Sequence, residues 1–272
     1  MDILANEVRR SIKTALIIML AATAWLCLTM LPFPALATET GWREIGGFFQ
    51  EQNKTLLEIA HLSDFVKAPA ANLYFSVIFQ PISLMFCVFF CWLGFSSISH
   101  EEKSGTIRYL YAMPVSRIQI ALQKILAGFV QILICFTFTL ALSFGLCLYL
   151  MRENYAIYEV LYTSYIILLG AFLSSATYLC VGFALSLFRI RRTRLATFFT
   201  VLISLACGFV GKYVLDSPYL QLLSPYNYAE APDVLFGGIG LLYFVVAPGL
   251  VIGCSAVTIW VFQNRDLIKK AV

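Results

Sequence analysis

The sequence predicts an all-α polytopic membrane protein with six transmembrane helices and both termini in the cytoplasm. Three observations support this fold class: an apolar composition, six long apolar runs, and an uneven distribution of lysine and arginine. Of the 272 residues, 60% are hydrophobic and only 12% are charged. Soluble domains have roughly 45–50% apolar and about 25% charged residues. Lipid is therefore the expected solvent for most of the chain.

The apolar runs define the expected organisation, a single transmembrane domain over residues 1–272. A spanning helix needs about 20 apolar residues, and six runs meet that length, at 14–34, 73–98, 125–150, 160–188, 195–215 and 239–262. The runs are continuous and do not alternate with a period of two, which argues against a lipid-facing β-barrel. The main connections are an external loop at 35–72, a charged segment at 99–124 and a tyrosine-rich external segment at 216–238, where we expect a re-entrant element.

Lysine and arginine set the expected orientation. Fourteen of the 19 lie in the N-terminus, the C-terminus and two connections that six spans place on the same side: Arg9, Arg10, Lys13, Lys103, Arg108, Arg117, Lys124, Arg189, Arg191, Arg192, Arg194, Arg265, Lys269 and Lys270. Cytoplasmic loops carry such an excess, so this side is predicted to be cytoplasmic. The first twelve residues should form an interfacial helix leading into the first span, with Ile3, Val8 and Ile12 near one face and Glu7 elsewhere.

Ionisable side chains are absent from the central parts of all six spans. Proton-coupled transporters and intramembrane proteases usually need such groups there. The two histidines, His61 and His100, fall on opposite sides of the membrane. Cys87 and Cys91 are one helical turn apart, but we interpret them as packing residues rather than metal ligands. No catalytic, metal or cofactor-binding residue is predicted, and the residues that contact a substrate are not identified.

Two glycine-containing motifs lie within spans. "GAFLSSAT" (170–177) and "GLVIG" (249–253) space small residues so that helix backbones can approach closely. They would serve either a subunit or gate interface, or ordinary packing within the chain. A third stretch, "GFVGKY" (208–213), superficially resembles a phosphate-binding loop, but its spacing is too short and no Ser or Thr follows the lysine. The chain is therefore not expected to hydrolyse ATP alone.

Segment 99–124 interrupts the apolar pattern with a folded connection. Ser99-x-x-Glu102 and Ser116-x-x-Gln119 both fit the capping box that starts a helix. Pro114 prevents one unbroken helix and disfavours helical geometry just before it. We expect a short amphipathic helix at 101–112, a break at 113–115, and a helix from 116 that continues into the third span. Its apolar residues would be offered to a partner at the cytoplasmic surface. The alternative is a solvated connector whose charges only set topology.

The stretch "EEKSGTIRYLYAMPVSRIQIALQKILA" (101–127) resembles the signature of ABC-2 type permeases, the membrane subunits of bacterial ATP-driven exporters. Paired acidic residues, a Gly-Thr, an amphipathic stretch, a Pro-x-Ser-Arg and a lysine (Lys124) entering the third helix follow in the family's order. "LLSPYNYAEA" (222–231) and "FQNRDL" (262–267) are similar to the family's external motif and C-terminal ending. The resemblance covers nearly the whole chain.

What the resemblance implies is a coupling helix that docks on a separate ATP-binding cassette ATPase. The matching residues, expected to couple to the ATPase, are Glu101, Glu102, Gly105, Thr106, Ile107, Leu110, Tyr111, Pro114 and Arg117. Two permease subunits, alike or different, would pair in the bacterial cytoplasmic membrane and pass an amphiphilic or hydrophobic peptide, drug or lipid outward. ATP and Mg²⁺ would be bound by the partner, and this chain would need no cofactor.

Three interpretations stay open from the residues alone. Besides a transport subunit, the chain would suit a membrane-embedded enzyme, although its spans offer few convergent polar groups, or a non-transporting sensor or immunity component. The basic run "RIRRTR" (189–194) is interpreted as a topology determinant. It would alternatively contact the ATPase or anionic lipid headgroups.

Overall fold

The computed structural model describes residues 3–31, 71–104, 115–150, 157–188, 192–215, 217–229 and 240–264. Every regular element in these ranges is helical. The six long helices are α1 (Ile3–Met30), α6 (Ala71–Ser104), α8 (Arg117–Leu150), α9 (Ile157–Ser186), α10 (Thr193–Tyr213) and α13 (Leu241–Asn264). Each is long and apolar enough to cross a membrane. The predicted all-α fold with six spanning helices is confirmed, while the side on which the termini lie stays a prediction.

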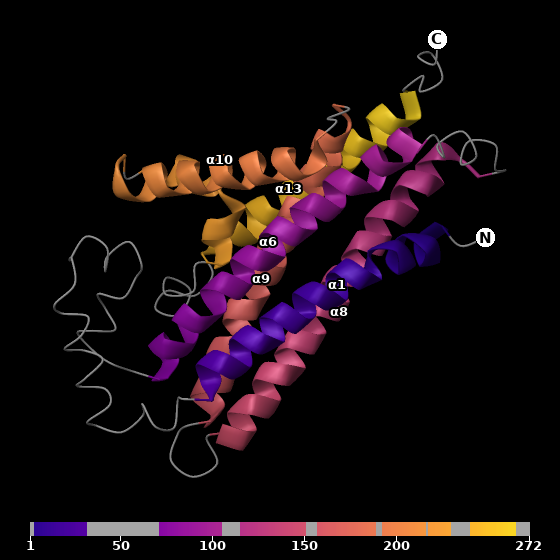
Figure 1. The fold of residues 1–272 in the computed structure, drawn as a ribbon. Coiled ribbons are helices and arrows are strands. Elements are labelled where there is room, and N and C mark those ends of the chain that lie inside the picture. The colour runs from indigo at the N-terminus through magenta and orange to yellow at the C-terminus, as the bar shows by residue number, and fades with distance from the viewer. Residues whose placement is uncertain are drawn as a thin grey trace.

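Four helices, α1, α6, α8 and α9, run side by side as a bundle (Figure 1), and α6 with α9 forms its most extensive contact. Two glycines bring these two backbones together. A side chain at Gly94 would overlap the carbonyl oxygen of Leu179, and one at Gly182 would overlap that of Cys91. Close approach of this kind replaces hydrophobic pairing as the reason for helices to associate in lipid. The α6–α9 contact therefore fixes the centre of the bundle.

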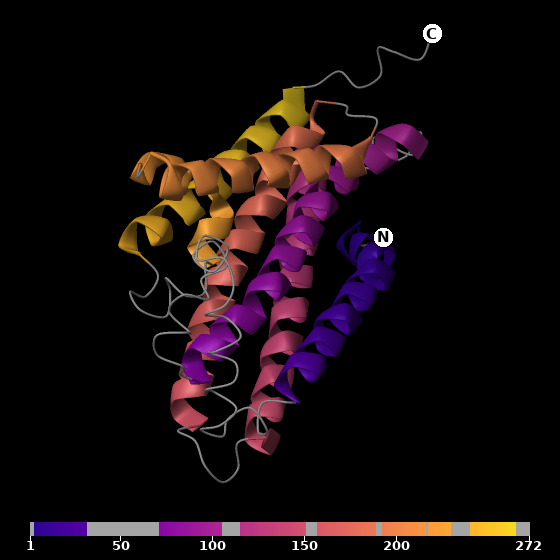
Figure 2. The same ribbon diagram turned by 60° about the vertical axis from the view of Figure 1, so that its left-hand side comes forward.

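The α10 helix departs from the bundle direction. Figure 2 shows it crossing the other helices at a steep angle, and Figure 1 gives the same impression from another side. Its C-terminal part packs on the short helix α11 (Pro218–Leu222) and on the 3₁₀ turn η1 (Pro225–Ala229). A side chain at Gly208 would lie 2.8 Å from the Ser224 hydroxyl. The glycines of "GFVGKY" are thus helix-packing positions.

In the segment that contains α11 and η1, Tyr228 is anchored against α13. Its ring is fully buried against the ring of Tyr243 on α13, and its hydroxyl donates to the Leu222 carbonyl at 2.7 Å. Burial, with Tyr243 as a smaller cause, raises the pKa of Tyr228 to about 12. The part of the predicted re-entrant element at 230–238 lies outside the described residues, as does nearly all of the external loop 35–72.

The two predicted capping boxes have different outcomes. At the start of α8 the Ser116 amide donates to Gln119 Oε1 at 3.2 Å, and the Gln119 amide donates to Ser116 Oγ at 3.3 Å. This reciprocal pair confirms the second box. The box at Ser99 is wrong, because α6 continues through Ser99 to Ser104 and Ser99 is interior to a helix. An apolar helix that already has its hydrogen bonds has no free amides for this serine to cap.

The two small-residue motifs also differ in whether they pack within the chain. Ser174, Ser175 and Thr177 on α9 are fully buried within the chain, so the first motif serves ordinary packing. On α13 no atom would lie within 4 Å of a side chain at Gly249 or Gly253. Among the described residues, the two glycines of the second motif therefore face open space, whereas Val251 between them packs against the core of the chain.

Candidate functional site

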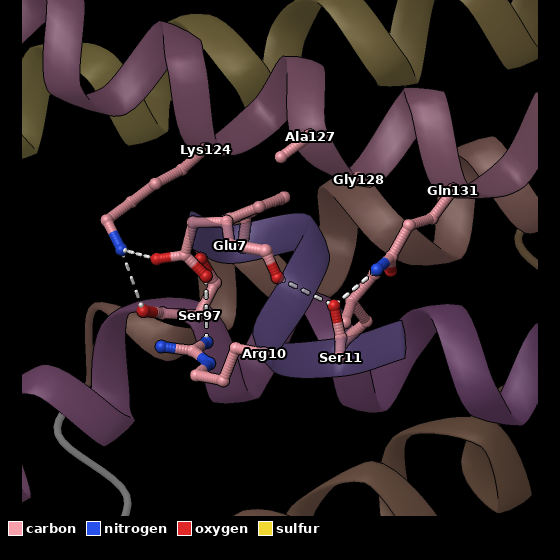
Figure 3. A pocket seen from close by; sticks show the side chains of 10 residues that line it. Glu7, Arg10, Ser11, Ser97, Lys124, Ala127, Gly128 and Gln131 are labelled. Carbon is pink, nitrogen blue, oxygen red and sulfur yellow. Dashed lines mark hydrogen bonds and ion pairs between the residues drawn. The ribbon is translucent and has the colours of Figure 1, made fainter. Parts of the chain in front are cut away.

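One lysine is buried at the end of the bundle where α6 ends and α8 begins. Lys124 on α8 is 2% exposed, and its ammonium group lies 2.5 Å from Glu7 Oε1, 2.6 Å from Glu101 Oε1 and 3.1 Å from the Ser97 carbonyl. These contacts use all three N–H donors of a lysine. The acceptors come from α1 and α6, so a single cation joins three helices. Glu7, Glu101 and Lys124 are called the charge cluster below, and Figure 3 shows two of its members, Lys124 and Glu7.

The sequence of α8 explains how the lysine reaches this position. After the capping box at Ser116, small residues share the helix face of Lys124: Ala121, Ala127 and Gly128 are all buried. Residues three, four or seven apart lie on one side of a helix. A side chain at Gly128 would meet Leu179 of α9 at 2.8 Å. This narrow face lets the neighbouring helices close around the lysine stem.

A second polar tie lies two turns further along the same face. Gln131 Nε2 donates to the Ser11 hydroxyl and to the Val8 carbonyl, the latter at 3.3 Å. The Ser11 hydroxyl in turn donates to the Glu7 carbonyl at 2.9 Å. Figure 3 shows the Gln131 side chain of α8 reaching the Ser11 hydroxyl of α1. The N-terminal part of α1 is thus held on α8 by polar side chains at two successive levels.

The charges of the cluster are balanced by a fourth residue. Arg10 Nη2 lies 3.0 Å from Glu7 Oε2, and Arg10 is the more exposed of the two side chains. Two carboxylates therefore face two cations. Removing one member of a buried ion pair leaves the other charge without compensation, which costs about 3–5 kcal/mol. A small cavity of about 10 Å³ remains beside Lys124, Gln131 and Ser97, space for roughly one water molecule.

Sequence reasoning placed Lys124 and Glu101 in a cytoplasmic connection and did not link either to Glu7. The sequence did contain one indication that Lys124 has a buried partner. Small, apolar residues surround this lysine on its helix face, and a charged side chain buried there requires a partner. The partner itself was not identifiable, because Glu7 is 117 residues away. In the parts of the chain that the structure describes, no group of three or more His, Cys, Asp or Glu residues is placed to hold a metal ion.

The predicted coupling residues fall at the borders of the described structure. Glu101 is in the charge cluster, its carboxylate directed at α8. Arg117, the first residue of α8, donates through Nη1 to the Gln263 carbonyl of α13 at 3.2 Å. Glu102 belongs to α6, but its side chain is not described. The remaining predicted coupling residues lie outside the described residues: Gly105, Thr106, Ile107, Leu110, Tyr111 and Pro114.

A large apolar groove lies between α1, α6 and α10, with a volume of about 690 Å³. Its walls include Ile18 of α1, Trp92 of α6 and Phe198 of α10, and Arg194 is its only charged lining residue among those described. Volumes of this size fit a drug-sized or lipid-like molecule. Helix α1 contributes residues to both the groove and the charge cluster.

Comparison with known proteins gives one informative result. No curated protein matches the sequence. A family model described as "ABC-2 family transporter protein" matches residues 1–267, and it therefore includes all six long helices, the charge cluster and the segment between α6 and α8. With nearly the whole chain matched and six membrane-spanning helices in the structure, this multi-pass membrane protein belongs to the ABC-2 transporter family.

Proposed function

We propose that the chain is the permease subunit of an ABC exporter in a bacterial cytoplasmic membrane. It moves an amphiphilic or hydrophobic substrate outward with energy from ATP hydrolysed by a separate ATPase subunit. Family membership and six spanning helices support a transport role. ATP and Mg²⁺ are bound by the partner in this proposal, and this chain is not itself an enzyme.

The observation that carries the ATPase partnership is the anchoring of the described residues on both sides of segment 105–114. Before it, Glu101 is bonded to Lys124 of α8, and through that lysine to α1. After it, Arg117 is bonded to the end of α13. An ATPase that docks on this segment would therefore act on several spans at once. The matching motif residues Ile107, Leu110 and Tyr111 supply the apolar contacts for docking in this proposal.

The groove between α1, α6 and α10 supports an amphiphilic or hydrophobic cargo. Its lining is aliphatic and aromatic, with the Thr14 and Thr197 hydroxyls and Arg194 as the polar exceptions. Such a lining would accept an apolar chain and one polar or charged end. A second permease subunit, identical or different, completes the pathway in this proposal. The uncovered Gly249 and Gly253 on α13 leave room for a helix from outside the chain.

The test is co-expression of the chain with an ATP-binding cassette ATPase encoded beside it. We expect the two to co-purify as an assembly with two permease subunits, and ATP hydrolysis to require both proteins. ATP hydrolysis by this chain alone would contradict the proposal. So would an ATPase that neither binds the chain nor changes its activity in the chain's presence.

A further inference from the structure

We propose that the charge cluster is a transmission element, in which Lys124 makes α1 follow movements of the end of α6 and thereby changes the groove between α1, α6 and α10. The proposal rests on the proposed function, because it supposes that an ATPase displaces the segment after α6. Lys124, Glu7 and Glu101 would be positioning residues, since none of them is among the described residues that line the groove.

The first step is the location of Glu101. This residue is three positions before Ser104, where α6 ends and segment 105–114 begins. Its carboxylate is buried and bonded to the ammonium of Lys124. The Ser97 carbonyl, one turn earlier on α6, accepts from the same ammonium. A displacement of the end of α6 therefore acts directly on Lys124.

The second step is the passage from Lys124 to α1. The carboxylate of Glu7 accepts a hydrogen bond from the same ammonium group at 2.5 Å. The backbone carbonyl of Glu7 accepts from the Ser11 hydroxyl, to which Gln131 of α8 also donates. Opposite charges interact strongly over short distances in a low-dielectric interior. Two carboxylates that share one buried cation resist separation from it, because either would be left desolvated and unpaired. The start of α1 and the end of α6 are thus constrained to move together or to exchange partners.

The third step is the passage from α1 to the groove. α1 is one continuous helix from Ile3 to Met30, so a displacement at Glu7 is carried to Thr14 and Ile18, which line the groove. Towards its other end, α1 is fixed by a hydrogen bond from Trp25 Nε1 to the Ile78 carbonyl of α6, at 3.0 Å. A helix held at Trp25 and moved at Glu7 changes the spacing between its middle and α10.

A purely structural role for the cluster would give the same contacts, so the experiment must separate the two. Lys124→Met alone leaves two carboxylates without their cation and can fail to fold. The triple variant Glu7→Met, Glu101→Met, Lys124→Met roughly keeps the side-chain sizes and removes every charge of the cluster. Replacement of a buried ion triad by hydrophobic residues of similar volume is often neutral for stability. The control is Arg9→Gln, which removes one charge from an exposed position of α1.

The measurement is the distance between spin labels at positions 20 of α1 and 199 of α10, in the assembled complex with its ATPase, with and without ATP. Leu20 and Phe199 are both exposed in the structure. Labels are attached through unnatural amino acids, because the chain has eight free cysteines of its own. ATP hydrolysis by the same samples shows whether the ATPase is bound and active.

We expect an ATP-dependent change of this distance in the unmodified chain and in Arg9→Gln. In the triple variant we expect the change to be lost while ATP hydrolysis is retained. A triple variant that keeps the full change would overturn the proposal, and so would an unmodified, hydrolysing complex in which the distance does not respond to ATP. Failure of the proposed function has a different signature: no ATPase is recovered with any variant, the unmodified chain included.

Discussion

Lys124 and Glu7 are 117 positions apart in the chain, yet the ammonium nitrogen of one lies 2.5 Å from a carboxylate oxygen of the other. Without the packing of α1 against α8, the side chains of both residues would be exposed to solvent. Their contact removes a cation and an anion from water and compensates each with the other. Since Glu101 shares the same cation, the end of the bundle from which segment 105–114 emerges is held by charge, whereas the bundle centre is held by glycine-mediated contact.

That central contact leads to the first prediction. Gly94→Ala should destabilise the protein by about 1–3 kcal/mol, the range for overpacking a well-packed core, because the new methyl group would overlap the Leu179 carbonyl oxygen. Gly145→Ala is the matched control, since nothing lies within 4 Å of a side chain there. It should be neutral or stabilising, as alanine is favoured over glycine in helices by roughly 1 kcal/mol. Thermal unfolding of the purified chain in detergent measures both; equal midpoints would contradict the close α6–α9 packing.

A second prediction concerns the two serines of the capping pattern. Ser116→Ala should lower the free energy of unfolding by about 1 kcal/mol, the usual contribution of an N-cap, because Ser116 accepts from the Gln119 amide. Ser99→Ala should have little effect. The Ser99 hydroxyl is buried in α6 without a hydrogen-bond partner, so its removal breaks no hydrogen bond and relieves the cost of burying an unpaired polar group. Denaturant unfolding in mixed micelles compares the two. A larger loss for Ser99→Ala would show that a helix begins there.

The helix count and the α8 start were predictable because they depend on local features. An apolar run of sufficient length specifies a spanning helix, and the capping box at Ser116 specifies where α8 begins. The box at Ser99 failed for a related reason: the same four-residue pattern occurs inside α6, and only the continuity of the preceding helix decides between a cap and an interior serine. Local sequence does not contain that information.

The charge cluster was not predictable as a site. Glu101 and Lys124 were recognised as members of a motif, but a motif does not say whether a side chain faces a partner protein or its own bundle. Glu7 was assigned to the polar side of an interfacial helix, whereas in the structure Glu7 contacts Lys124 of α8 while Arg9 stays exposed. The contact depends on tertiary packing of α1, which the apolar pattern of its first twelve residues did not specify.

A third prediction tests the orientation. In a chain whose eight native cysteines are replaced by serine or alanine, a cysteine introduced at position 219 on α11 should react with a membrane-impermeant reagent added to intact cells, whereas one at position 192 before α10 should not. The lysine and arginine distribution predicts that residue 192 lies in the cytoplasm. Both Tyr219 and Arg192 are exposed in the structure, so burial within the chain does not limit either reaction. Permeabilised cells, in which both positions should react, supply the control. External labelling at position 192 would reverse the proposed topology.

The last prediction concerns docking of the ATPase on the segment between α6 and α8. Leu110→Asp should abolish association with the ATPase while membrane abundance stays normal. The physical reason is that loss of an apolar anchor from a protein interface costs on the order of 2 kcal/mol or more, and such a change weakens binding roughly thirtyfold. The position precedes α8 and follows α6, so no described bundle contact depends on it.

Arg192→Ala is the control for this experiment, because it removes a charge from the other basic connection on the same predicted side and should leave association nearly unchanged. A pull-down of the ATPase at matched membrane abundance gives the comparison. Lys124 and Glu101 are kept intact in both variants, so the charge cluster still joins α1, α6 and α8. If Leu110→Asp retains the ATPase and Arg192→Ala loses it, the docking surface belongs to the connection before α10, and the anchored segment after α6 has another role.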